Sequence, residues 1–237
     1  MFDQNNFSIA LDPIIRLDGT LLYAEALCRP KINELYVNLE SWFVAQHKAG
    51  RANQIDLIMA NKVSKLVPQM QLNCGINITP STAIFHGHSL LDHLHNHRTQ
   101  TIIEIVEWDS PLLYRDERFF KFIELAKSLG FKIMLDDVGS GGFNDIDIVK
   151  ALKSDGLKTH LKHIEFALSA LLPNQELIIE YVKTEDLFNQ VTLRGATACQ
   201  GIHPREFYQR SAGFKVEISP YITAITEPNY FFSNKAA

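Results

Sequence analysis

The sequence predicts an α/β protein, a (β/α)8 TIM-like barrel with an antiparallel first strand. Short apolar runs alternate with segments of helical periodicity along most of the 237 residues, which is typical of a parallel sheet with crossover helices. Seven or eight such units favour a closed barrel over an open sheet. The first two runs are separated only by a Leu-Asp-Gly-Thr turn at residues 17–20, so we expect them to pair as an antiparallel hairpin.

The individual elements follow from apolar periodicity and from turn residues. Gly130 follows the helical segment at residues 112–129, at the position where a glycine commonly ends a helix, and Pro173 ends the helical segment at residues 161–172. A polar turn is predicted at Thr79-Pro80-Ser81. The expected strands are residues 7–15 (broken at Asp12-Pro13), 21–28, 72–78, 101–106, 131–135, 155–158, 176–182 and 197–201. The expected helices are residues 39–49, 55–66, a segment within 90–98, 112–129, 143–153, 161–172 and 185–193.

The chain contains no internal repeat and no low-complexity linker. We therefore expect residues 1–237 to form a single domain, with a core at about residues 7–210 and a C-terminal extension at about 211–237. Charged and apolar residues alternate at positions 215–218, so this segment could add an edge strand or a partner surface. Phe231-Phe232 could form a contact patch or close the barrel bottom.

Composition excludes several classes of protein. With 46% hydrophobic and 21% charged residues, the chain can bury a sizeable core. A net charge of −4 argues against binding of long nucleic acid, which needs a basic face, but allows a small anionic ligand held by metal ions. Three widely spaced cysteines suit a reducing compartment. The N-terminus does not resemble a signal peptide and no apolar run is long enough for a membrane span, so we expect a cytoplasmic protein.

Polar side chains occur near the ends of almost all the predicted strands. Asp136 and Asp137 follow an apolar run directly and precede a glycine-rich loop at residues 139–142. Taken alone, this pair could cap the next helix or lie in water. In a barrel, however, the strand ends meet at one face. The side chains delivered there are Glu25, Asn77, Glu104, Asp136, Asp137, Lys158, Glu180 and Gln200.

Clustered carboxylates of this kind repel one another unless cations neutralise them. Because the donors are oxygen atoms, they predict Mg²⁺ or Mn²⁺ rather than zinc. A second cluster, of histidines, lies within residues 86–97, and His93 and His97 have the spacing of a helical zinc pair. No suitably spaced glutamate or cysteine accompanies them, so we interpret this cluster as a solvated helix face.

The same residues carry a family resemblance. The ordered motifs are Glu25-Ala26-Leu27 with Arg29, Asn77 in INITP, Glu104-Ile105-Val106-Glu107, Asp136-Asp137-Val138-Gly139-Ser140-Gly141, Asp155-Gly156-Leu157-Lys158, Glu180 with Val182, and Gln200-Gly201. Together they resemble the EAL domain, the family of cyclic diguanylate (c-di-GMP) phosphodiesterases, over about residues 9–204. The resemblance also implies that the protein could form a homodimer through the region after the Asp136-Asp137 loop.

The resemblance implies a two-metal site. One ion would be held by Glu25, Asn77 and Glu104, and the second by Asp137 and Glu180, with Asp136 bridging both. Lys158 would orient or deprotonate the attacking water, and Gln200 would hold that water or its shell. The resemblance also implies three supporting roles: Arg29 would clamp a substrate phosphate, Asp12 would bear on guanine recognition, and Glu107 would brace the loop after Asp137.

Several positions depart from the family pattern. His160 stands where the family usually has aspartate, Lys183 where glutamate is usual, Asp12 where many members have glutamine, and residues 142–144 replace a tyrosine-serine-serine run. The main prediction is a metal-dependent phosphodiesterase that converts c-di-GMP to linear pGpG. The alternative is a catalytically weakened regulator that binds c-di-GMP or a protein partner. An unrelated metal-dependent barrel hydrolase is the weakest reading.

Overall fold

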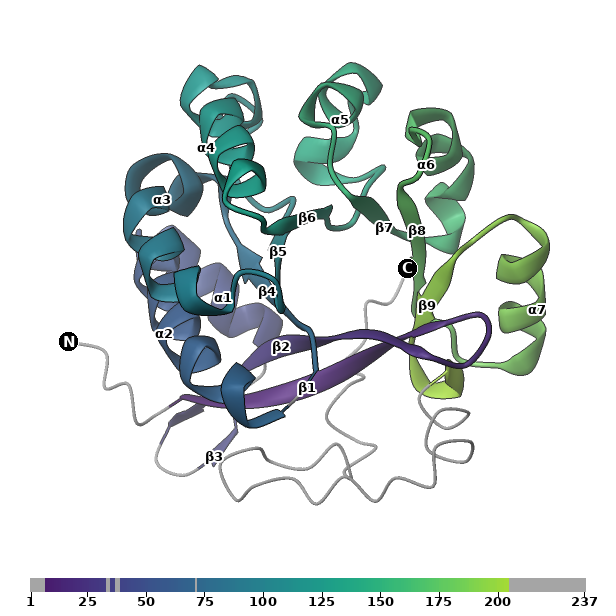
Figure 1. The fold of residues 1–237 in the computed structure, drawn as a ribbon, viewed down its shortest axis with the longest axis horizontal. Coiled ribbons are helices and arrows are strands. Elements are labelled where there is room, and N and C mark those ends of the chain that lie inside the picture. The colour runs from purple at the N-terminus through teal and green to yellow at the C-terminus, as the bar shows by residue number, and fades with distance from the viewer. Residues whose placement is uncertain (1–6, 33–34, 37–38, 71, 205–237) are drawn as a thin grey trace.

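The computed structural model describes residues 7–32, 35–36, 39–70 and 72–204 and shows a ring of strands surrounded by helices (Figure 1). The hydrogen-bonded strand order is β1-β9-β8-β7-β6-β5-β4-β2-β3, and β1 also pairs with β2, which closes the barrel. β1 is antiparallel to β2 and β9, whereas the pairs from β2–β4 to β8–β9 are parallel. The predicted fold, including its antiparallel first strand, is confirmed.

The strands are β1 (Phe7–Arg16), β2 (Leu21–Ile32), β3 (Leu35–Tyr36), β4 (Cys74–Ile78), β5 (Thr101–Ile105), β6 (Lys132–Leu135), β7 (Gly156–His160), β8 (Glu176–Glu180) and β9 (Ala198–Gln200). The helices are α1 (Leu39–Lys48), α2 (Ala52–Met70), α3 (Pro80–Leu94), α4 (Glu117–Ser128), α5 (Ile146–Leu152), α6 (Ile164–Ala170) and α7 (Glu185–Leu193). Short 3-10 turns are η2 (His95–His97), η3 (Leu113–Arg115), η4 (Gly141–Phe143) and η5 (Leu161–His163). The predicted extension after residue 210 lies outside the described residues.

The break predicted at Asp12-Pro13 is wrong. β1 runs without interruption, with Asp12 opposite Glu25 and Pro13 opposite Ala24 on β2. The pairing of β1 with β9 begins only at Ile14. The residues of β1 before Ile14 therefore make no hydrogen-bonded ladder with β9. A proline is tolerated on such an unpaired side, because its missing N–H removes no inter-strand hydrogen bond.

The polar turn predicted at Thr79-Pro80-Ser81 is also wrong, because α3 begins there. Thr79 is the N-cap and its hydroxyl accepts a hydrogen bond from the backbone N–H of Thr82. Pro80 occupies the first helical position, where its fixed φ suits the helix and its missing N–H costs nothing. The helix expected within residues 90–98 therefore starts ten residues earlier and ends in η2.

The core has two parts. The larger part packs helix residues such as Val63, Leu90 and Phe119 against the outer face of the strands. The smaller part contains only strand residues, namely Ile14, Tyr23, Ile102, Met134, Ile178 and Ala198, and fills the barrel interior. All three cysteines are free and buried, and His86, His88, His93 and His95 are exposed. No helix in the described ranges is long and apolar enough to cross a membrane.

Candidate functional site

The predicted site residues form a layer directly above the interior apolar layer. Side chains two residues apart on a strand point to the same face, and every interior apolar residue lies two positions from a predicted site residue. The pairs are Tyr23 with Glu25, Ile102 with Glu104, Met134 with Asp136, Ile178 with Glu180, Ala198 with Gln200 and, on the reversed strand β1, Ile14 with Asp12. Thus the apolar layer is the floor of the site.

Lys158 lies at the centre of this layer. Its ammonium group is 2.6 Å from Glu104 Oε2, 3.0 Å from Asp136 Oδ1, 3.2 Å from Glu25 Oε2 and 3.6 Å from Glu180 Oε1. The lysine side chain is fully buried. The structure therefore brings together carboxylates from β2, β5 and β8 and from the end of β6 around one cation on β7.

Glu25 receives further hydrogen bonds from neutral amides. Asn77 Nδ2 donates to Glu25 Oε1 at 2.6 Å, and Gln200 Nε2 donates to Glu25 Oε2 at 2.8 Å. Gln200 also donates to Asp12 Oδ2 at 3.2 Å. These bonds turn both amide oxygens away from Glu25, so each amide can offer its oxygen to another group.

Several buried oxygen atoms in this layer have no hydrogen-bond partner. They are Asn77 Oδ1, Glu104 Oε1, Glu180 Oε2 and Gln200 Oε1, together with the Tyr23 hydroxyl, whereas Asp136 Oδ1 is paired with the Lys158 ammonium group at 3.0 Å. Buried polar atoms are rarely left unpartnered, so such a cluster needs an explanation. Four of the five are carbonyl or carboxylate oxygens, the donors that a hard divalent cation prefers.

Gly75 on β4, which pairs with Ile102 of β5, leaves room for the Glu104 side chain. A Cβ atom on Gly75 of β4 would overlap Glu104 Oε1 and approach the Tyr23 ring to 2.7 Å. Only glycine leaves Glu104 in its present position. The unpartnered Glu104 oxygen consequently occupies space that any larger side chain at residue 75 would fill.

The electrostatics show an excess of negative charge. Burial, opposed only in part by Lys158, raises the pKa of Glu104 to about 8 and that of Asp136 to about 6. Burial and the neighbouring Asp136 raise the pKa of Glu180 well above its usual range. Burial would also raise the pKa of Glu25, but Lys158, Gln200 and Asn77 hold it below the usual value. One ammonium does not neutralise four carboxylates.

Asp137 and Glu107 lie at the edge of the layer. Asp137 has a left-handed backbone with φ of 50°, which starts the glycine-rich loop. Glu107 makes a side-chain hydrogen bond with Asp137, and burial together with the charges of Asp136 and Asp137 raises its pKa to about 9. The Glu107 carbonyl oxygen also accepts a hydrogen bond from Gly142 N at 3.2 Å. Glu107 therefore contacts both ends of the loop.

A cavity of about 730 Å³ opens above the layer. Its lining includes Asp12, Arg29 and His160, together with Glu25, Asn77, Glu107, Asp136, Asp137, Glu180 and Gln200. Lys158 and Glu104 lie below it, fully buried. The volume is in the range of clefts that hold a small organic ligand. The structure thus places all the sequence-predicted residues in or directly beneath one cavity.

Comparison with known proteins assigns the family. The EAL domain model matches residues 1–170, which is more than half of the chain. The chain belongs to the EAL domain family. No curated protein matches it.

Solved EAL structures share its fold. An EAL domain protein from Listeria monocytogenes superposes with a TM-score of 0.73 at 17% identity, over 89% of this chain and 94% of that chain. The PaMucR phosphodiesterase in complex with c-di-GMP gives a TM-score of 0.70 at 18% identity, over 84% and 90%. BlrP1 from Klebsiella pneumoniae, in a calcium and c-di-GMP complex, gives 0.68 at 17% identity, over 85% and 56%. At these identities the likeness shows the fold.

The donor set of this EAL domain suits a divalent cation, although Lys158 draws the carboxylates to itself. Among the described residues, no three His, Cys, Asp or Glu side chains are arranged as a ready-made ion site. The unpartnered oxygens of Asn77, Glu104 and Glu180 nevertheless belong to three of the six predicted ligands. Their chemistry therefore fits Mg²⁺ or Mn²⁺.

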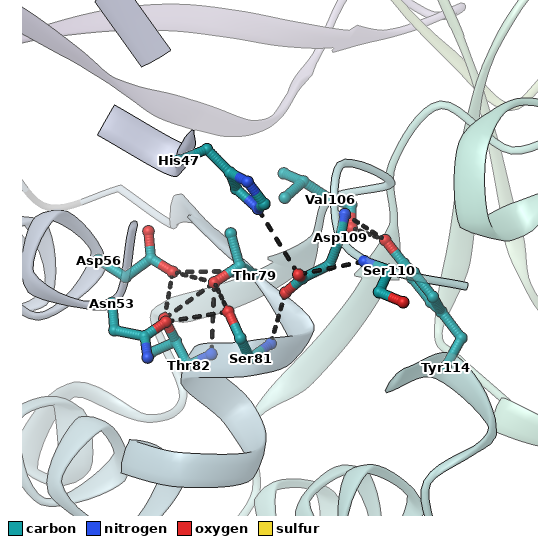
Figure 2. A network of polar contacts seen from close by, with 10 residues as sticks. All are labelled: His47, Asn53, Asp56, Thr79, Ser81, Thr82, Val106, Asp109, Ser110 and Tyr114. Carbon is teal, nitrogen blue, oxygen red and sulfur yellow. Dashed lines mark hydrogen bonds and ion pairs between the residues drawn. The ribbon is translucent and has the colours of Figure 1, made fainter. Parts of the chain in front are cut away.

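Sequence reasoning missed Asp56, a buried carboxylate on α2 that lines the same cavity. Its Oδ2 accepts hydrogen bonds from Thr79 N at 2.9 Å, Thr79 Oγ1 at 2.8 Å and Thr82 Oγ1 at 2.6 Å. Figure 2 shows its other oxygen pointing away from these partners. Burial raises the pKa of Asp56 to about 6. The sequence did contain one signal, namely a single acidic residue within a segment whose apolar residues have helical spacing.

The same hydrogen-bond network continues from Asp56 and Thr79 to residues behind the cavity lining (Figure 2). Asn53 Oδ1 accepts from Ser81 Oγ at 2.9 Å and from Thr82 Oγ1 at 3.0 Å. Asp109 Oδ2 accepts from Ser81 N at 2.7 Å, and Asp109 Oδ1 lies 3.5 Å from His47 Nε2. We call Asn53, Asp56, Thr79, Ser81, Thr82 and Asp109 the α3 cap network, because it is built around the first turn of α3.

Proposed function

We propose that this EAL domain is a divalent-metal-dependent phosphodiesterase that hydrolyses c-di-GMP to linear pGpG. The observation that carries the proposal is the cluster of unpartnered, negatively charged oxygen donors on the barrel axis beneath a ligand-sized cavity. Complexes of structurally similar EAL proteins with c-di-GMP support the choice of ligand.

The proposed ligands for two Mg²⁺ or Mn²⁺ ions are Glu25, Asn77, Glu104, Asp136, Asp137 and Glu180. All six supply oxygen, and their excess negative charge would be neutralised by the ions. When bound, such ions lower the pKa of a water molecule and stabilise charge on phosphate oxygens. The hydrogen bonds from Asn77 and Gln200 fix the orientation of Glu25 in advance of binding.

Lys158 is proposed to orient the attacking water. Burial would lower the pKa of Lys158, but the surrounding carboxylates raise it well above its usual value. A lysine that keeps its proton can donate a hydrogen bond to water, so the orienting role suits this arrangement better than the role of a base. Gln200 is proposed to hold the same water through its unpartnered Oε1.

Three residues are proposed to bind the substrate. Arg29 lines the cavity and can clamp a phosphate with its planar guanidinium group. Asp12 and Asp56 also line the cavity, and both can accept hydrogen bonds from the N–H groups on a guanine edge. Glu107 is proposed to hold the loop that carries Asp137, as its bonds to Asp137 and Gly142 suggest.

The test is product analysis. The purified chain is incubated with c-di-GMP and Mg²⁺, Mn²⁺ or Ca²⁺, and cyclic and linear dinucleotides are separated by chromatography. We expect linear pGpG from the wild type with at least one metal and none from Glu25→Ala. If the cyclic form survives every metal while binding is retained, the enzyme assignment fails.

The alternative function is a regulator that binds c-di-GMP or a protein partner without turnover. Two observations favour it: the Lys158 ammonium group already contacts four of the carboxylates, and His160 replaces the acid usual in the family. Binding of c-di-GMP without any linear product would select this alternative. A homodimer is compatible with either function, and sedimentation would establish the oligomeric state.

A further inference from the structure

One end of the cavity differs in character from the acidic layer. It lies where β7 and β8 end and is lined by His160, Lys162, Tyr181 and Lys183. The ring centroids of His160 and Tyr181 are 5.6 Å apart and the planes are inclined at 36°. Both lysines are exposed. We call these four residues the basic aromatic end.

Tyr181 has an unusual backbone. Its φ is +59°, a left-handed conformation that a bulky residue adopts only at a cost. Its neighbours fix this conformation, because Val182 N donates to Gln200 O at 3.0 Å and His203 N donates to Val182 O at 3.2 Å. The residue is nevertheless 42% exposed, so the cost is not offset by complete burial. Strain retained at a cavity wall is characteristic of functional positions.

His160 is oriented by its own turn. The backbone N–H of Lys162 donates to His160 Nδ1 at 3.2 Å. Because Nδ1 accepts this bond, the neutral imidazole carries its proton on Nε2. His160 can therefore donate from Nε2 to an anionic ligand, beside the positive charges of Lys162 and Lys183.

A second part of the cavity wall, contributed by α1 and the loop after β5, also has aromatic side chains. Phe43 and Trp108 pack edge to face there, with ring centroids 5.8 Å apart, and both line the cavity together with Asp56. A ligand that contacts both parts of the wall thus meets aromatic rings twice. A cyclic dinucleotide has two bases and two phosphates, which matches this distribution.

We propose that the basic aromatic end is a clamp for one half of a cyclic dinucleotide, in which Tyr181 stacks on a nucleobase while His160, Lys162 and Lys183 contact the adjacent phosphate. The inference rests on the proposed ligand class but not on catalytic turnover. Stacking on an aromatic side chain and contact with phosphate are both tolerant of base identity, so the clamp supplies affinity rather than base selection.

The test distinguishes the contribution of the Tyr181 ring to binding from the effect of its left-handed backbone on stability. Calorimetric titration with c-di-GMP, in Mg²⁺ and in chelator, compares wild type with Tyr181→Phe, Tyr181→Ala and Tyr181→Gly. We expect Tyr181→Phe to bind within about twofold of wild type, and both Ala and Gly variants to bind about tenfold more weakly, as for loss of one stacked base. Because glycine relieves the left-handed strain, Tyr181→Gly should also raise the melting temperature.

The lysines provide a second measurement. The double variant Lys162→Gln, Lys183→Gln should bind more weakly and should lose part of the salt dependence of the wild type, because fewer phosphate contacts remain. If Tyr181 served only to stabilise the fold, the Tyr181 variants would instead have lower stability and unchanged affinity for c-di-GMP.

The outcomes distinguish this proposal from the proposed function. Tyr181→Ala with wild-type affinity would overturn the clamp and leave hydrolysis untouched. Tyr181-dependent binding without linear product would support the clamp and overturn the phosphodiesterase. A wild type that binds no c-di-GMP under either condition would overturn both.

Discussion

Two buried polar clusters lie side by side in this barrel, and they differ in how completely their atoms are paired. In the α3 cap network, one Asp56 oxygen accepts three hydrogen bonds, and the hydroxyls of Thr79, Ser81 and Thr82 are linked to one another or to Asn53. On the barrel axis, four carboxylates share one lysine, and oxygens of five side chains have no hydrogen-bond partner.

The difference separates a cluster that mainly stabilises the fold, and in which Asp56 also lines the cavity, from a cluster built to bind cations. A satisfied network stabilises the fold without any ligand, whereas unpartnered buried acceptors destabilise it until a ligand supplies what they lack. The α3 cap network begins a helix and joins α2, α3 and the loop after β5. The axial cluster holds like charges together, and either protonation or a further cation relieves their repulsion.

The largest expected effect is on catalysis. Glu104→Gln removes a proposed metal ligand that is fully buried. Since loss of a residue that merely orients a ligand costs about 10–100-fold, we expect loss of the ligand itself to lower kcat by at least about a hundredfold. At pH 9, above the Glu104 pKa of about 8, metal-free stability should stay constant or rise, because one buried negative charge disappears while Lys158 keeps three other carboxylates. The exposed Glu124→Gln on α4 is the matched control, and a comparable loss of kcat there would contradict the assignment.

The next effect is a pH dependence of stability. Burial, with nearby negative charge, raises the pKa of Glu104 to about 8 and of Glu107 to about 9. The folded state therefore binds more protons than the unfolded state between the unfolded pKa, near 4.5, and these values, so metal-free stability should fall as pH rises through this window. The lowered pKa of His160 acts in the opposite direction, but the raised pKa values of Asp56, Asp136 and Glu180 add to those of Glu104 and Glu107.

Urea unfolding at pH 5, 7 and 9, with and without Mn²⁺, measures this dependence. We expect Mn²⁺ to restore most of the stability lost at pH 9 and to have little effect at pH 5, where the carboxyls hold protons. Stability that rises steadily from pH 5 to pH 9 in the absence of metal would contradict the charge excess on the axis.

A smaller effect is expected in the α3 cap network. Thr82→Val keeps the side-chain shape but removes a fully buried hydroxyl that donates to Asp56 at 2.6 Å. The cost should be about 1–3 kcal/mol of unfolding free energy, measured in urea. Thr192→Val on α7, whose exposed hydroxyl donates to Phe188 O, should cost less. An equal cost at both sites would show that the network adds nothing to stability.

The smallest expected effect concerns His160. His160→Asp introduces a carboxylate at the cavity edge near Asp137, so the affinity for Mn²⁺ should increase severalfold. Calorimetry on the two proteins measures it. His160→Asn, which is neutral and of similar size to aspartate, is the control, and an equal gain with asparagine would exclude a charge effect.

The axial cluster could be predicted from sequence because its signal is repeated. Apolar runs such as those before Glu104 and Asp136 end in acids, and a parallel barrel brings strand ends together. Because side chains two residues apart on a strand point to the same face, each site residue lies two positions from an apolar residue of the floor, as Tyr23 and Glu25 show. The ligand roles of these residues stay predictions until a metal is measured.

The remaining features depend on tertiary contacts that leave no local pattern. Asp56 resembles any acid on an amphipathic helix until Thr79 and Thr82 are seen to surround it. Tyr181 gives no sign of its left-handed backbone, which is imposed by the pairing of Val182 with β9. Thr79-Pro80-Ser81 has the composition of a turn and of a helix start, and the buried Asp56 favours the second.

The central claim is that the unpartnered oxygens on the barrel axis hold divalent cations, and Mn²⁺ binding tests it most directly. Free Mn²⁺ is followed by electron paramagnetic resonance during titration into wild type, Glu104→Gln and Glu124→Gln at pH 8, with and without c-di-GMP. We predict that wild type and Glu124→Gln remove Mn²⁺ from solution, whereas Glu104→Gln binds it far more weakly. Mn²⁺ that stays free in the presence of the wild-type protein under both conditions would contradict the claim.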